Sequence, residues 1–146
     1  ARPATLAYDP AGDDWRTLPS PPLAPPPLAV TAVWTGEDIV AWDYELHAAR
    51  LDPAAGRQAA WTALPDLPLQ FRDCLPQGAA ADGVVFAEHC GQGAVYRPSP
   101  GTWSVVPHPK GLAARPVWTG DELLFWTGRF VASADGVWRY RIPTGP

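Results

Sequence analysis

The side chains of this sequence that offer the simplest chemistry are three histidines and two glutamates. His47 and His89 lie 42 residues apart and are expected at equivalent positions of successive repeats, on one face of the molecule, with Glu45 and Glu88 close by. Imidazole titrates near neutral pH, and imidazole and carboxylate groups both bind metal ions, so this set could form a metal site or an acid–base pair. His108 is expected in a connector on the same face. Solvated loop histidines are the simpler interpretation of all three.

A second set combines arginine with aromatic side chains. Arg72 and Arg115 each precede an apolar run. Such groups around a concave mouth suit carboxylated or polyhydroxylated ligands and protein loops. The alternative for both arginines is an internal pairing, with Asp73, with Glu88 or with neighbouring carbonyl groups. The predicted binding residues are Tyr44, His47, Arg72, His89, Arg115, Arg129 and Phe130.

Motifs that would name a reaction are absent from the sequence. It has no phosphate-binding loop, no Gly-x-Ser-x-Gly elbow and no paired Cys-x-x-Cys framework for zinc. We therefore predict no catalytic residue, no metal and no cofactor, and a binding or scaffolding module rather than an enzyme. An enzyme with a metal-assisted or acid–base site, related to sugars and built from His47, His89 and Glu88, is the second hypothesis.

The two cysteines are placed to form a disulfide. If Asp82-Gly83 is the turn of a hairpin, residues whose numbers sum to about 164 face each other across it. Cys74 and Cys90 then form a direct cross-strand pair, close enough for a bond. Two buried free thiols are the alternative. A disulfide favours an exported protein, since such bonds persist in oxidising compartments.

Composition narrows the class of protein. The chain has 146 residues, of which 47% are hydrophobic and 18% charged, enough for the core of one domain. The content of 19 Pro and 13 Gly indicates many short elements, as in an all-β protein. A net charge of −4 with scattered basic residues argues against a nucleic-acid partner. No apolar run approaches the roughly 18 residues of a membrane span.

A recurring phrase organises the elements that would position these side chains. It reads Trp, two variable residues, an aliphatic residue and Pro, and it begins at Trp15, Trp61 and Trp103. The separations of 46 and 42 residues match the period of one propeller blade. The segment Val-Trp-Thr-Gly at 33–36 also returns at 117–120, two periods later. Each phrase is expected to start an outermost strand, its indole filling the gap to the neighbouring blade.

The apolar runs between Gly- and Pro-containing turns predict short antiparallel strands. The Pro-rich stretch at 19–27 is expected to be a polyproline II spacer on the surface. All strands belong to one domain over residues 1–146. Its predicted parts are a half-blade at about 5–18, a blade at about 29–65, a blade at about 75–107 and a partial blade at about 115–143.

Taken together, these motifs resemble the kelch-type β-propeller repeat of secreted or envelope-associated bacterial proteins. The likeness covers nearly the whole chain and includes Tyr-Asp-Pro at 8–10, ahead of the phrase that begins at Trp15. It implies propeller blades and a secreted or envelope location, but no single activity, since kelch-like propellers are binding scaffolds, sugar-acid isomerases and copper oxidases. The copper type uses a Tyr crosslinked to Cys, which a bond between Cys74 and Cys90 disfavours.

Two features depart from that family's pattern. The diglycine that usually follows the second strand is replaced by Asp43-Tyr44, Glu88-His89 and Thr127-Gly128. The chain also holds only about three blades, whereas a closed propeller needs roughly four to eight. We therefore expect an oligomer in which a second copy closes the ring, or else a longer polypeptide whose remainder does so.

Overall fold

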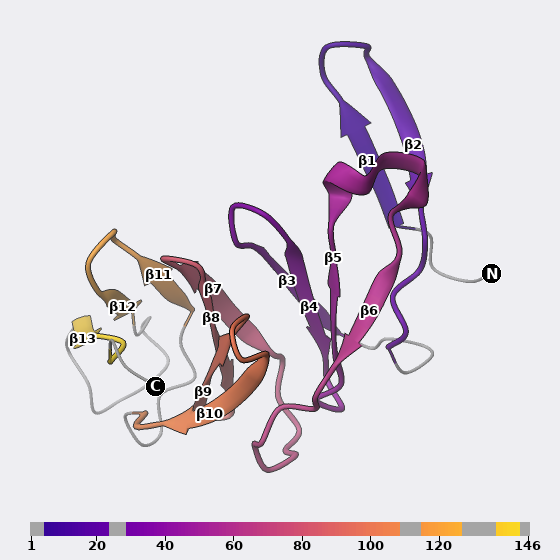
Figure 1. Ribbon diagram of the computed structural model, residues 1–146. Helices are drawn as coiled ribbons and strands as arrows, with labels where there is room; N and C mark the ends of the chain where they lie inside the picture. Colours follow the sequence, from indigo (N-terminus) through magenta and orange to yellow (C-terminus); the bar gives the residue numbers. More distant parts are fainter. Residues whose placement is uncertain (1–4, 24–28, 109–114, 127–136, 144–146) are drawn as a thin grey trace.

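The computed structural model describes residues 5–23, 29–108, 115–126 and 137–143, and their strands form four antiparallel sheets (Figure 1). The structure is 52% strand and 4% helical, which confirms the all-β prediction. None of the four sheets is closed on itself. Among the described residues no helix is long and apolar enough to cross a membrane.

The strands follow one another along the chain, and each sheet uses consecutive strands. A 3-10 helix, η1 (Pro53–Gln58), is the one helical element among the described residues, and the sequence had not predicted it. The sheets are β1 (Thr5–Asp9) with β2 (Asp14–Leu18); β3 (Val30–Trp34), β4 (Ile39–Asp43), β5 (Ala48–Leu51) and β6 (Trp61–Leu64); β7 (Gln77–Ala81), β8 (Val84–His89), β9 (Gln92–Arg97) and β10 (Thr102–Val106); and β11 (Pro116–Trp118), β12 (Leu123–Trp126) and β13 (Val137–Tyr140).

The repeated Val-Trp-Thr-Gly segments form equivalent turns. The hydroxyl oxygen of Thr35 accepts a hydrogen bond from the amide three residues later at 3.0 Å, and that of Thr119 does the same at 3.2 Å. The glycines that follow, Gly36 and Gly120, have φ angles of 104° and 100°, which L side chains rarely adopt. The match in sequence is therefore a match in backbone geometry.

The last three sheets are arranged with their first strands, β3, β7 and β11, together. In Figure 1 the sheets fan outward, and β7 lies between β3 and β11. The hydroxyl of Thr31 on β3 donates a hydrogen bond to the carbonyl oxygen of Pro76, just before β7, at 2.6 Å. Within each of the larger sheets the remaining strands follow in chain order away from this shared inner edge.

Hydrophobic cores lie between successive sheets. The β1–β2 hairpin packs on the second sheet, the second on the third, and the third on the fourth, so both faces of the middle sheets are buried. This burial explains their nearly continuous apolar sequences. The three clusters contain, in order, Leu18, Leu51 and Ala59; Val40, Trp42, Val85, Ala87 and Tyr96; and Phe86, Val95, Val106, Leu123 and Phe125.

The three predicted tryptophans lie at the starts of β2, β6 and β10, as the first residue of β6 and the second of β2 and β10. Trp103 packs edge-on against Trp42 of the preceding sheet, with ring centroids 6.3 Å apart. Trp61 donates its indole N–H to the carbonyl oxygen of Pro19 at 2.7 Å, beside the hairpin that precedes its sheet. Trp15 differs, because it is 63% exposed, and among the described residues its ring contacts that of Tyr8 on its own hairpin. No described sheet covers Trp15, so its gap-filling role stays a prediction.

Candidate functional site

One end of the molecule gathers the loops that the sequence singled out. In the second sheet the start of β3 lies beside the end of β4, where Val30 pairs with Asp43. In the third sheet the start of β7 lies beside the end of β8 in the same way, where Gln77 pairs with Glu88. The amide of Tyr44 donates to the carbonyl oxygen of Ala29 at 3.0 Å. We call this the loop end and define it as residues 43–47, 65–76 and 89–92.

Three rings form an aromatic cluster at the loop end. Tyr44 packs edge-on against Phe71 with centroids 5.1 Å apart, and both rings lie 6.4 Å from the ring of His89. Phe71 is 56% exposed, Tyr44 is half-buried and His89 is buried. The Tyr44 hydroxyl donates to Asp73 at 2.7 Å, and this hydrogen bond raises the pKa of Tyr44. The cluster therefore presents an exposed ring on a fixed, hydrogen-bonded base.

Arg72 directly follows Phe71 of this cluster, and Arg115 directly precedes β11 at the shared inner edge. Both are exposed, and neither Arg72 nor Arg115 has a side-chain ion pair or hydrogen bond within the described part of the chain. The alternative prediction, an internal pairing of these side chains, finds no support among the described residues. Arg115 lines a hollow of about 500 Å³ formed by the first residues of β3, β7 and β11 and the segment before β7. Both guanidinium groups are exposed and lack an ion-pair partner among the described residues, so they could bind an anion.

The predicted equivalence of His47 and His89 is wrong. By strand register Ile39 corresponds to Val84, so the counterpart of His89 is Tyr44. The period of 42 residues holds for the outermost strands and not for β4 and β8, because the link from Leu51 to its partner Trp61 is three residues longer than the link from Tyr96 to its partner Trp103. His89 is also not in an exposed loop, because it is the last residue of β8 and is fully buried.

The predicted set of His47, His89 and Glu88 is not assembled as a metal-ligand group. Among the described residues, the three-ligand group that lies together is Cys74, His89 and Cys90. His47 instead bonds to Asp43, with its Nδ1 3.2 Å from the carboxylate. His108, expected on the same face, packs its ring on Phe86 and Phe125, with centroids 6.3 and 5.2 Å away.

Asp43 shapes the loop after β4, a role that the sequence analysis missed. One of its carboxylate oxygens accepts the backbone N–H groups of Glu45 at 2.9 Å and of His47 at 3.0 Å. The side chain is buried, so these bonds offset the cost of removing the charge from water. The signal was present in the sequence, since an acidic residue directly after an apolar strand is typical of such a turn.

Glu88 occupies the corresponding place in the third sheet. It is buried, and its carboxylate accepts the N–H of Gly91 at 2.7 Å. Burial raises the pKa of Glu88 to about 7, against an opposing effect of that hydrogen bond. Glu88 therefore stabilises the turn after β8 but resists ionisation.

We expect replacement of Glu88 by Gln to remove a pH-dependent loss of stability. The folded pKa of about 7 lies above the unfolded value of 4.5, so folding is disfavoured progressively as pH rises between these values. Above pH 7 the wild type should be less stable than E88Q by on the order of 2 kcal/mol, and near pH 4 the two should agree. Urea unfolding between pH 4 and pH 8 measures the free energy of unfolding of both proteins. A difference between them that does not change with pH would contradict the raised pKa of Glu88.

The predicted disulfide is present. Cys74 and Cys90 are bonded, with Cα atoms 5.8 Å apart. The detail of the prediction is wrong, because β7 begins only at Gln77 and pairs with β8 in a register shifted by one residue. Cys74 thus lies in the loop before β7, and the bond ties that loop to the turn after β8. The loop end is held at its centre by a covalent link.

The remaining predicted residues divide into two groups. Tyr44 and His47 lie at the loop end as expected, and Phe71 joins them although it was not predicted. An exposed aromatic residue in a Pro-rich loop was the signal for Phe71. Arg129 and Phe130 lie outside the described residues, as does the Thr127-Gly128 segment.

No protein-family model and no curated protein matches this chain.

Proposed function

We propose that this chain is a section of a kelch-like β-propeller and acts as a binding module, with the loop end as its contact face. The observation that carries the proposal is the pair of exposed neighbours Phe71 and Arg72, of which Arg72 has no side-chain partner among the described residues. The first strands that lie together at an inner edge, and the cores between successive sheets, support the blade interpretation.

The chemistry of this face suits an acidic carbohydrate. An exposed ring fixed by Tyr44 packs on the apolar face of a sugar, and guanidinium groups make charge-assisted hydrogen bonds to a carboxylate. Arg115, at the rim of the inner hollow, extends the cationic surface. The ligand class we propose is an oligosaccharide that carries a carboxylate, such as one containing uronic acids.

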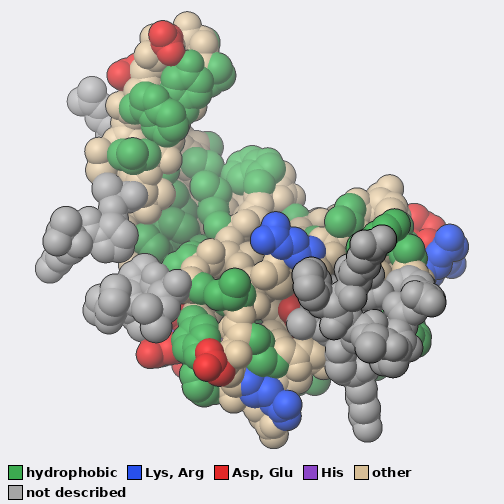
Figure 2. Space-filling view, turned by 180° about the vertical axis from the view of Figure 1, so that it is seen from behind, with side chains coloured by type: hydrophobic (Ala, Val, Ile, Leu, Met, Phe, Trp, Pro, Cys, Tyr) green, Lys and Arg blue, Asp and Glu red, His purple; other side chains and the backbone are tan. Residues whose placement is uncertain are grey.

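Further sheets complete the propeller, and they come from a second copy or from the rest of a longer polypeptide. Large apolar side chains are exposed at both ends of the stack: Trp15 and Leu6 on the hairpin, and Trp126 and Trp138 on the last sheet. Figure 2 shows hydrophobic side chains along the projecting hairpin. Such surfaces are normally covered, because exposed sheet faces and edges promote aggregation. The disulfide favours a secreted or envelope location.

Calorimetric titration with uronic-acid oligosaccharides tests the proposed ligand class. We expect Phe71→Ala to weaken binding about 3- to 10-fold, the value of one stacking contact. Arg72→Gln should weaken binding of acidic ligands about 10-fold or more and leave neutral analogues unchanged.

The matched control is Tyr8→Ala, which removes an exposed ring from the hairpin, away from the loop end. Its affinity should equal that of the wild type. Absence of binding to any carboxylated oligosaccharide, or equal losses in Phe71→Ala and Tyr8→Ala, would overturn the proposal.

A further inference from the structure

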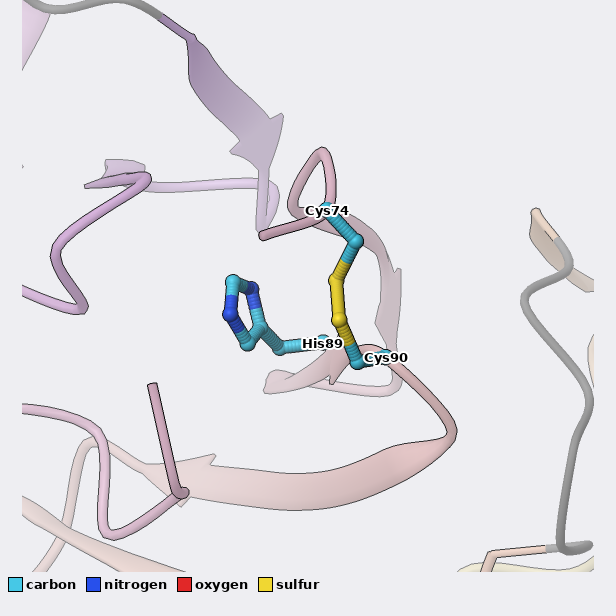
Figure 3. Close-up of side chains that lie close together, drawn as sticks. All are labelled: Cys74, His89 and Cys90. Carbon is cyan, nitrogen blue, oxygen red and sulfur yellow. A yellow bond between two sulfur atoms is a disulfide. The ribbon is translucent and has the colours of Figure 1, made fainter. Parts of the chain in front are cut away.

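The disulfide lies beside a histidine whose free nitrogen faces it. Ligand atoms of Cys74, His89 and Cys90 all lie within 4.8 Å of one another. In Figure 3 the imidazole stands next to the sulfur–sulfur bond, and the ring nitrogen adjacent to the side-chain attachment point is on the sulfur side. This nitrogen is Nδ1. It is buried and has no hydrogen-bond partner among the described residues.

The opposite nitrogen of His89 is held by the backbone of Arg72. Nε2 lies 2.9 Å from the Arg72 carbonyl oxygen and 3.2 Å from the Arg72 amide nitrogen. In one tautomer Nε2 accepts the Arg72 N–H; in the other Nε2 carries the proton and donates it to the carbonyl oxygen. In the second tautomer Nδ1 carries a lone pair. A histidine that donates one N–H to a backbone carbonyl and presents its other nitrogen is the usual arrangement of a metal-ligating imidazole.

The surroundings hold this imidazole in place. The ring of His89 is buried, and the rings of Tyr44 and Phe71 pack around it. Glu88, the adjacent carboxyl group, directs its oxygen to the amide of Gly91. The charged groups nearest the site on the neighbouring loop, Arg72 and Asp73, are exposed, and Asp73 accepts the Tyr44 hydroxyl.

We propose that Cys74, Cys90 and His89 form a Zn²⁺ site that opens when the disulfide is reduced. A dithiol reductant supplies two electrons and two protons, the S–S bond breaks to two thiols, and the reductant closes to its own disulfide. One Zn²⁺ then displaces both thiol protons and binds two thiolates and Nδ1 of His89. A water molecule completes a tetrahedral set, the arrangement of zinc sites with three protein ligands.

The backbone permits this exchange. Both cysteines are half-buried and accessible, and both lie outside the strand ladders, Cys74 in a loop and Cys90 in a turn. Two Zn–S bonds of about 2.3 Å at a tetrahedral angle place the sulfurs roughly 3.8 Å apart. Rotation of the two side chains achieves this at the observed Cα separation of 5.8 Å. The loop end thus stays tied at the same point in both states.

Cobalt titration of the reduced protein tests the site directly. The whole chain is reduced with a phosphine, which transfers electrons without offering a thiol, and is then titrated anaerobically with Co²⁺. We expect one Co²⁺ per chain, with the visible bands of a tetrahedral ion and a thiolate-to-cobalt charge-transfer band. Zn²⁺ should displace it, and the oxidised protein should show neither band.

Variants separate the proposed site from adventitious binding by thiols. His89→Ala should weaken Co²⁺ binding at least about 10-fold, with His89→Gln as a second variant of similar size that preserves packing. His47→Ala, a half-exposed histidine at the same end, is the matched control and should bind like the wild type. Far-UV circular dichroism checks that each reduced sample is folded.

Several outcomes would overturn the proposal. These are no binding by the reduced wild type, an octahedral spectrum, equal affinity of His89→Gln and His47→Ala, or a reduced chain that unfolds and is not refolded by Co²⁺. A failure of oligosaccharide binding alone would contradict the proposed function but not the metal site, since the cobalt spectrum reports only on the metal ligands.

Discussion

Replacement of Trp42 by Ala is expected to lower the free energy of unfolding by about 3 to 5 kcal/mol, as for other large buried aromatic residues. Trp42 is fully buried in the core between the second and third sheets. It contacts Trp103 edge-on and covers Gly78 so closely that no side chain would fit there. Urea unfolding monitored by circular dichroism gives the difference in stability.

The matched control for this prediction is Trp34→Ala on strand β3. The same indole is removed, but Trp34 is more than half exposed, so the loss should stay within about 0.5 to 1 kcal/mol. If Trp42→Ala were no more destabilising than Trp34→Ala, the second and third sheets would not be packed on one another as described.

Loss of the disulfide in a Cys74→Ser, Cys90→Ser double variant is expected to cost about 3 kcal/mol, because a closed loop of this size restricts the unfolded chain. The two residues are 16 apart in the sequence. Unfolding of the wild type should reach the same lower stability when a reductant is present.

A chelator in both samples keeps this measurement independent of the proposed metal site. The double variant itself should be insensitive to reductant, which is the control. A difference between oxidised and reduced wild type of less than about 0.5 kcal/mol would contradict a structural role for the bond.

Much of the fold was predictable because its signals are local. Glycines with positive φ such as Gly36, and the Trp-to-Pro phrases, fixed the turns and the outermost strands, and the expected strands are all found where the chain is described. The helix η1 was missed. It follows Asp52, which caps the helix by accepting the N–H of Ala54 at 2.8 Å. An Asp followed by Pro is also typical of a turn, so this sequence did not distinguish a short helix from a loop.

The site was less predictable, because it depends on register and burial. The period of 42 residues holds for the outermost strands, but β4 and β8 start 45 residues apart, so Tyr44 and not His47 corresponds to His89. The burial of His89 arises from the loop at 65–76 folding over it, a contact between segments far apart in sequence. Phe71 and Asp73 belong to that same loop, so their roles also follow from its path.

The central claim is that these sheets are a section of a ring in which every sheet face is covered. Hydroxyl-radical footprinting of the native, assembled protein tests it at Trp15, which is 63% exposed in the single chain. The oxidation rate of each residue in the native protein is compared with the rate of the same residue in urea. We predict strong protection of Trp15, whichever sheet covers it, and little protection of Phe71 at the contact face. Oxidation of Trp15 at close to its unfolded rate would contradict the account.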